Sequence, residues 1–275
     1  MTGDPEEGER MTNDHWDSAT AYDRFMGRWS RRLAPKFVDW LNVADGSAWL
    51  EIGCGTGALT SAICERANPG SVVAVDTAPE FVEYCTRQLS YESLRVTQGT
   101  VDSLPPHQEG YGAVVSSLVL NFLPDTIDSL KKMKLICSPR GSVAACVWDY
   151  SKGMELLRFF WDAAVAIDPS ATVFDEGVRF PLCQPDALRA AFHQAGLHNI
   201  EIAPITIPTI FQSFEDYWSS LSEGTGPAPS YVASLSTSKR EALASSLKAL
   251  TSPNGSGPLT LQASAWAIKS SVKAE

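Results

Sequence analysis

The segment LEIGCGTG, residues 50–57, constrains the fold of this chain more than any other part of the sequence. It follows a short apolar run typical of a buried strand, and a helical pattern begins near its end. Its glycines let the chain turn tightly and let the backbone approach a ligand at a helix N-terminus. Because Gly53, Gly55 and Ala58 also satisfy the G-x-G-x-x-G/A spacing of dinucleotide sites, the turn alone leaves the ligand open.

Three acidic residues accompany this turn and narrow the choice of ligand. Asp76 ends the next apolar run, where a carboxylate can accept hydrogen bonds from both hydroxyls of a ribose, as happens in several kinds of nucleotide site. Asp102, in GTVDSLP, can accept from the exocyclic amine of an adenine while the Val101 amide donates to the ring. Glu51 suits a cationic ammonium group and would repel a pyrophosphate. The set therefore favours an adenosyl ligand with a cationic end.

Strand and helix patterns alternate along the chain, which predicts an α/β fold with a parallel sheet covered on both faces. One or two amphipathic helices are expected between residues 15 and 42. Strands are expected at 47–52, 71–76, 94–98, 112–117, 142–148, 200–207 and 259–268, and helices at 56–67, from Pro79 onward and at 124–136, the last closed by Ser138–Gly141.

Two segments depart from this alternation, and we predict that they form a helical lid over the substrate. Residues 150–183 contain the aromatic helix LLRFFWDAAVAI, and residues 209–257 contain helices near 214–221 and 237–250. The Ser/Pro/Gly-rich stretches at 222–236 and 251–258 are expected to be loops. The aromatic residues are expected either to pack as core or to line an apolar pocket; they include Trp29, Trp148, Tyr150, Phe174, Phe180, Tyr217, Trp218 and Tyr231.

Composition narrows the possible partners. The formal net charge of −10 opposes a large phosphate-binding surface, so a small molecule is the expected partner and nucleic acid is not. The six cysteines form no C-x-x-C pair, and the four histidines are isolated from one another, so we expect buried thiols in a reducing cytoplasm and no metal. No apolar run approaches the roughly 18 residues of a membrane-spanning helix. Residues 1–13 are acidic and polar, and we expect a disordered leader before a domain spanning 14–275.

The motifs together resemble those of the type 11 class I methyltransferases that depend on S-adenosylmethionine (SAM), a group similar to the C-methyltransferases of ubiquinone and menaquinone biosynthesis. EIGCGTG resembles the first motif of that family, VVAVD the second, GTVDSLP the third and AVVSSLVLNFLP the fourth, and LICSPRGSV resembles the approach to the fifth strand. The resemblance covers about residues 15–148 by motif and the rest by strand order. It implies a Rossmann-like seven-stranded sheet of order 3-2-1-4-5-7-6, with the last strand antiparallel.

The same resemblance implies which residues contact SAM and its product S-adenosylhomocysteine. Tyr22 and Arg28, in YDRFMGRW, fall where an N-terminal helix of the family closes over the methionine end of SAM. The full set of expected cofactor contacts is Tyr22, Arg28, Glu51, Gly53, Cys54, Gly55, Gly57, Asp76, Thr77, Val101, Asp102, Ser103 and Ser117.

Candidate catalytic residues are Asn121, Asp149 and Tyr150. Many members of the family have a histidine where this chain has Asn121, which cannot act as a base near neutral pH. Asp149 and Tyr150 directly follow the fifth expected strand and can orient or deprotonate a substrate, although Asp149 equally suits a cap for the next helix.

Three functions follow from these patterns. The first is SAM-dependent methyl transfer to a small, largely apolar or aromatic acceptor such as a quinone or natural product. The second is a SAM-binding protein that transfers no methyl group, either a regulator or an enzyme of another reaction. The third, an NAD-dependent oxidoreductase, rests only on the glycine spacing.

Overall fold

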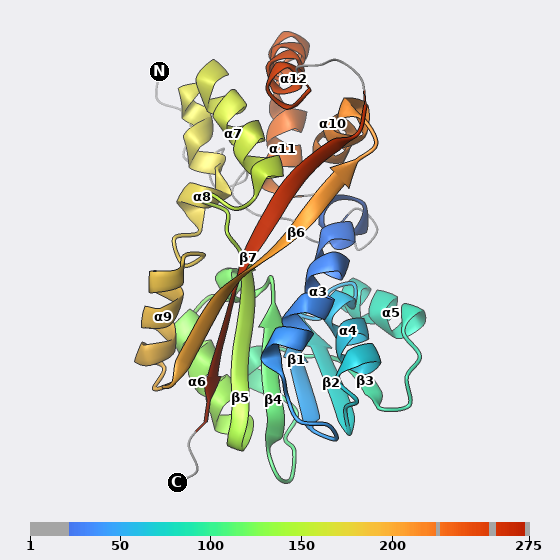
Figure 1. The fold of residues 1–275 in the computed structure, drawn as a ribbon, viewed down its shortest axis with the longest axis vertical. Helices are drawn as coiled ribbons and strands as arrows, with labels where there is room; N and C mark the ends of the chain where they lie inside the picture. The colour runs from blue at the N-terminus through green and yellow to red at the C-terminus, as the bar shows by residue number, and fades with distance from the viewer. Residues whose placement is uncertain (1–21, 224–225, 253–256, 273–275) are drawn as a thin grey trace. The chain divides into compact units, whose positions relative to one another are not determined.

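The computed structural model describes residues 22–223, 226–252 and 257–272 (Figure 1). The chain divides into two compact units. The first contains residues 27–148, 182–206 and 265–275, and the second contains residues 1–26, 149–181 and 207–264. The expected leader at 1–13 lies outside the described residues.

A seven-stranded sheet forms in the order β3-β2-β1-β4-β5-β7-β6. Strands β1 to β5 pair in parallel, and β7 runs antiparallel to β5. The predicted order and the reversed last strand are both confirmed. The strands are β1 (Ala48–Ile52), β2 (Ser71–Asp76), β3 (Leu94–Gln98), β4 (Tyr111–Ser117), β5 (Cys137–Trp148), β6 (Ile200–Phe211) and β7 (Leu259–Ser271).

Helices cover both faces of the sheet in the first unit (Figure 1). Two of them lie against β2 and one lies against β3, while a second group packs on β4 and β5. The first group is α4 (Ala58–Arg66) and α5 (Pro79–Gln88), with α3 (Arg28–Leu41) packed on α4. In the second, α6 (Thr126–Ile136) contacts the strands and α9 (Pro185–Gln194) packs on α6. Short helical turns lie at Asp23–Gly27 (η1, a π-helix), Val101–Ser103 (η2) and Leu120–Phe122 (η3). The continuous apolar runs of the central strands follow from this coverage, because side chains on both faces are buried.

Strand β5 begins five residues earlier than the sequence predicts. The expected turn at Ser138–Gly141 is instead part of the strand. The register against β4 shifts between Tyr111 and Ala113, and Arg140 adopts a left-handed φ of 68°. A bulge of this kind keeps a turn-like segment within a ladder, so local turn chemistry was a poor guide here.

The second unit is largely helical. Its elements are α7 (Glu155–Ile167), η4 (Pro169–Phe174), α8 (Glu176–Arg179), α10 (Phe214–Ser222), α11 (Pro227–Ser234) and α12 (Thr237–Thr251). The prediction of a loop at 222–236 is wrong where α11 forms. Pro227 lies in the first turn of this helix, where the backbone N–H that proline lacks would have no partner within the helix. Tyr231 and Val232 of this helix are buried, so packing overrides the loop-like composition.

An aromatic cluster forms the core of this second unit. The Tyr231 ring lies 5.5 Å from Trp161 and 5.8 Å from Phe174, measured between ring centroids. The Trp161 indole donates its hydrogen bond to the buried carboxyl of Glu176. These rings pack against one another in the manner of a core, the simpler of the two expectations for the aromatic helix.

Glu176 makes the stability of the chain depend on pH. Burial raises the pKa of this carboxyl from 4.5 to about 7. As the pH rises, the carboxyl group loses its proton in the unfolded chain before it does so in the folded chain. The free energy of unfolding therefore falls between the unfolded-state pKa and the folded-state pKa, by roughly 3 kcal/mol in total.

Glu176→Gln keeps an acceptor for Trp161 without a charge. We expect this variant to match the wild type at about pH 5 and to be more stable at about pH 8, as measured by urea unfolding. The exposed Glu241→Gln is the control. Equal unfolding midpoints of wild type and Glu176→Gln at the higher pH would contradict the assignment.

Candidate cofactor site

The glycine turn joins β1 to α4, and its three glycines meet different surroundings. Gly53, Gly55 and Gly57 all have left-handed φ angles, of 75°, 52° and 83°. A Cβ at Gly53 would lie 2.5 Å from the Val119 side chain, and one at Gly57 would lie 2.9 Å from the Cys85 sulfur. A Cβ at Gly55 would meet no protein atom within 4 Å. The turn is thus packed on protein at two glycines and open at the middle one.

The backbone amides at the start of this turn are bonded to the neighbouring strand. Gly53 and Cys54 both donate to the Val75 carbonyl, at 2.8 and 3.0 Å. Gly55 donates to Oδ2 of Asp76 at 2.8 Å. Amides that already serve protein acceptors cannot also cradle a pyrophosphate, so the geometry opposes a dinucleotide despite the matching glycine spacing.

Asp76 lies against the turn with both carboxylate oxygens engaged. Oδ2 accepts from Gly55, and Oδ1 accepts from the Ala78 amide at 3.0 Å. Each carboxylate oxygen has a second lone pair, so the group can still accept from ribose hydroxyls. The structure therefore brings Asp76 and the glycine turn together, as the sequence predicts.

Glu51 lies beneath the same turn as a buried acid. Its side chain is 1% exposed, and Oε2 accepts from the Thr60 hydroxyl at 2.6 Å. Burial raises the pKa of this carboxyl well above its usual value, and the hydrogen bond from Thr60 opposes the shift. A ligand cation nearby would favour the ionised form, so the position suits a positively charged group.

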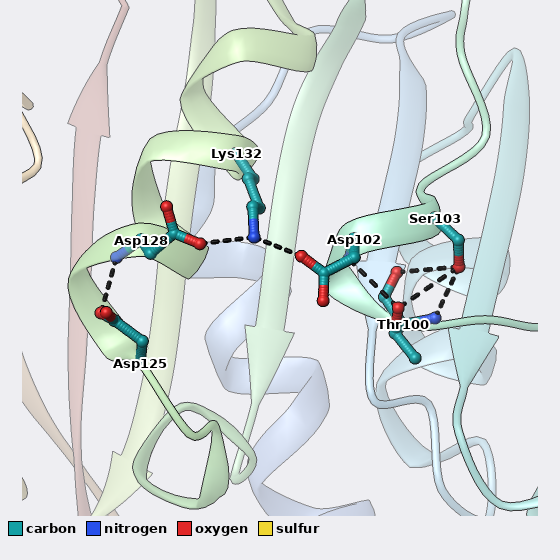
Figure 2. A network of polar contacts seen from close by, with 6 residues as sticks. All are labelled: Thr100, Asp102, Ser103, Asp125, Asp128 and Lys132. Carbon is teal, nitrogen blue, oxygen red and sulfur yellow. Dashed lines mark hydrogen bonds and ion pairs between the residues drawn. The ribbon is translucent and has the colours of Figure 1, made fainter.

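Asp102 lies on η2, at the same edge of the sheet. Asp76 is in register with Gln98 at the end of β3, and η2 begins three residues later. Figure 2 shows the Asp102 side chain directed at Lys132 of α6, with which it forms an ion pair. Thr100 and Ser103 hold the backbone of η2 through a capping box. Asp102 is therefore fixed by a partner that the sequence did not indicate.

Several buried polar groups at this edge have no hydrogen-bond partner among the described residues. They are the hydroxyls of Thr56 and Ser116 and both polar atoms of the Asn121 amide. Ser116 is in register with Ile52, which precedes the glycine turn, and Val119 packs on that turn. Buried unpaired polar groups are rare and costly in folded proteins, so this cluster indicates that a ligand completes the site.

Strain marks the loop after β4. Leu118 has a left-handed φ of 63°, which is unfavourable for a residue with a branched side chain. Its amide donates to the Cys146 carbonyl of β5 at 2.7 Å, which helps to hold the conformation. Such strain is concentrated at functional sites.

The remaining expected contacts are distributed over both units. Thr77 is exposed and accepts a hydrogen bond from Gln98 on its carbonyl, and Ser117 ends β4 half-buried. The Arg28 guanidinium lies 4.5 Å from the centre of the Trp29 ring. Tyr22 belongs to the second unit, so its approach to the methionine end of a cofactor stays a prediction.

Asp149 and Tyr150 also belong to the second unit. Oδ1 of Asp149 accepts from the Ser151 hydroxyl at 2.8 Å and from the Lys152 amide at 3.1 Å, so this carboxylate caps the turn that follows β5. The Tyr150 ring lies 5.6 Å from that of Phe180. Their catalytic roles stay predictions.

Sequence reasoning missed Thr56, Ser116 and Lys132. Thr56 lies inside the glycine motif and could have been found there, because a hydroxyl between two glycines has few neighbours to bond. Ser116 resembles any small residue of a buried strand. Lys132 and Asp102 are 30 residues apart in the sequence, so no local sequence pattern predicts their contact.

The comparison with known families decides the identity of the domain. Residues 50–141 match a family model described as a methyltransferase domain. Residues 50–141 therefore form a methyltransferase domain, within a sheet of the order that the sequence predicts. The match begins at the glycine motif and ends within β5, so it contains the turn, Asp76 and Asp102.

Curated relatives of the methyltransferase domain differ in how far they align. Demethylmenaquinone methyltransferase of Bacillus licheniformis is 24% identical over 190 residues, covering 64% of this chain and 81% of that protein. The aklanonic acid methyltransferase DauC of Streptomyces sp. is 26% identical over 140 residues, covering 50% and 64%. Malonyl-acyl-carrier-protein O-methyltransferase of Priestia megaterium is 26% identical over 96 residues, which is 35% of either protein. The chain thus spans between about a third and four fifths of these relatives.

Solved structures share the fold. The YcgJ protein of Bacillus subtilis has a TM-score of 0.56 at 15% identity, covering 90% of this chain and all of that one. Phosphoethanolamine N-methyltransferase 2 of Haemonchus contortus, bound to phosphomonomethylethanolamine and S-adenosylhomocysteine, has a TM-score of 0.55 at 13% identity, covering 94% and 57%. At these identities the likeness shows the fold alone.

SAM is the cofactor that the methyltransferase match implies for this site. The residues present fit it, because the open side of Gly55 and the unpaired Thr56 hydroxyl lie beside a carboxylate suited to ribose. When bound, SAM supplies a methyl group made electrophilic by the sulfonium charge. In this chain Asp76 would hold the ribose, and Glu51 would supply negative charge to the methionine end.

A matched pair of glycine variants tests the open side of the turn. Gly55 and Gly46 have left-handed φ angles of 52° and 75°, and neither would place a Cβ within 4 Å of another protein atom. Alanine at either position should therefore cost about 1–2 kcal/mol of stability through backbone strain. Only Gly55→Ala should also weaken SAM binding, by about tenfold or more in calorimetry. Unchanged SAM affinity in Gly55→Ala would show that the ligand does not approach the turn there.

Proposed function

We propose that this methyltransferase transfers the methyl group of SAM to a small, largely apolar or aromatic acceptor of the quinone or polyketide type. The observation that carries the proposal is the set of unpaired polar groups around the glycine turn, above all the Asn121 amide. Relatives named for demethylmenaquinone and for aklanonic acid support this acceptor class. The net charge of −10 argues against a polyanionic acceptor.

Asn121 fits a role in orienting the acceptor. It lies on η3, two residues after the Val119 side chain that packs on Gly53. Its amide can donate and accept hydrogen bonds but cannot take up a proton near neutral pH. We therefore expect this side chain to hold an oxygen of the acceptor in line with the methyl group, and alignment of this kind accounts for much of the acceleration of a displacement.

The acceptor then has to be reactive without a base at this position. An enol or phenol that ionises in water meets this condition, because its anion is already a nucleophile. Asp149 is a weaker candidate for a base, since one of its oxygens caps a turn. The proposal therefore favours hydroxylated quinones and related acidic aromatic compounds over alcohols.

Incubation with SAM and a hydroxylated naphthoquinone, followed by mass spectrometry, tests the proposed function. We expect a product heavier by one methylene group, and we expect Asn121→Ala to raise the KM for the acceptor about tenfold while the Kd for SAM stays unchanged. The exposed Asn42→Ala serves as the control variant. A protein that binds SAM but methylates no hydroxylated aromatic compound would instead support the alternative of SAM binding without methyl transfer.

A further inference from the structure

The ammonium group of Lys132 lies between two carboxylates at the adenine side of the site. It pairs with Asp128 on its own helix α6 and with Asp102 on η2 (Figure 2). The Lys132 side chain is 35% exposed, and that of Asp102 is 70% exposed. Lys132 is therefore the connection through which α6 holds the side chain of Asp102.

The helix prepares Lys132 for this contact. Asp128 precedes Lys132 by four residues, so the two side chains lie on one face of α6. The first turn of the helix is fixed in turn by Asp125, whose carboxylate accepts from the Asp128 amide at 2.9 Å. The hydrogen bonds that Lys132 donates to both carboxylates raise its pKa, so it stays charged throughout the neutral range.

The backbone of η2 is held independently of this ion pair. The Thr100 amide donates to the Ser103 hydroxyl at 3.0 Å, and the Asp102 amide donates to the Thr100 hydroxyl at 3.2 Å. These bonds fix the main chain at Asp102 but not its exposed carboxylate. Among the described residues, the carboxylate contacts the protein through Oδ1, which accepts a hydrogen bond from Lys132.

We propose that Lys132 is a positioning residue for adenine recognition, which holds Oδ1 of Asp102 so that Oδ2 is directed to the exocyclic amine of the cofactor. The proposal rests on the assignment of Asp102 to the adenine. An exposed ion pair contributes little to folding stability. It can nevertheless restrict a side chain before the ligand arrives, which removes part of the ordering cost from binding.

Paired ligands and a matched lysine variant provide the test. Lys131 is the exposed neighbour of Lys132, so Lys131→Met removes the same charge without touching the contact to Asp102. S-adenosylhomocysteine carries the exocyclic amine, and S-inosylhomocysteine carries a carbonyl oxygen in its place. We expect Lys132→Met to weaken binding of S-adenosylhomocysteine roughly threefold to tenfold, with little change for the inosyl compound.

Lys131→Met should leave both Kd values unchanged, and Lys132→Arg should retain most of the preference for adenine, because it restores a cation. A general loss of structure would weaken both ligands equally and lower the melting temperature, which would overturn the positioning role. Equal ligand preference in Lys132→Met and wild type would overturn it as well.

Asp102→Ala separates this inference from the assignment on which it rests. If Asp102→Ala leaves the ratio of the two Kd values at the wild-type value, Asp102 does not read the adenine and both ideas fail. If Asp102→Ala abolishes the preference while Lys132→Met keeps it, only the role of Lys132 is wrong. The proposed acceptor class is unaffected by either result, because no acceptor is present.

Discussion

The hydrogen bonds between the glycine turn and the end of β2 are the constraint on which the site depends. The Val75 carbonyl accepts from Gly53 and Cys54, and the Asp76 carboxylate accepts from Gly55. These bonds extend the parallel pairing of β1 with β2 beyond the last strand residues and bring the Asp76 carboxylate, the predicted ribose ligand, against the turn. They also use the amides that a phosphate-binding loop leaves free. One set of contacts thus explains the conformation of the turn and leads us to expect a nucleoside there and not a pyrophosphate.

The three acidic side chains around this turn differ in how deeply they are buried. Glu51 is buried beneath the turn, and burial raises its pKa, so its negative charge is favoured when a cation lies close by. Asp76 is half-buried and bonded to two amides, whereas Asp102 is exposed and paired with Lys132. The methionine, ribose and adenine parts of SAM differ in charge in a corresponding way: a cation, neutral hydroxyls and a neutral amine. We therefore propose that each of these acids contacts a different part of one ligand.

Much of the first unit was predictable because its signals are local. The strands β2 and β3 have the predicted bounds, Pro79 begins α5, and the strand order follows from the family resemblance. The errors arose where long-range contacts override local composition. Pro227 begins a helix because the side chains of Tyr231 and Val232, on the same helix, are buried in the core. The ion pair of Lys132 could not be predicted because it joins segments far apart in sequence. Asp149 and Tyr150 lie in the second unit, and their catalytic roles stay predictions. Among the described residues no helix is long and apolar enough to cross a bilayer.

Calorimetric titration of the protein with SAM and with NAD under identical conditions tests the central claim most directly. If the amides of the turn serve Val75 and Asp76 as described, SAM should bind with a measurable heat and NAD should give none. Saturable binding of NAD, with no binding of SAM, would contradict the account.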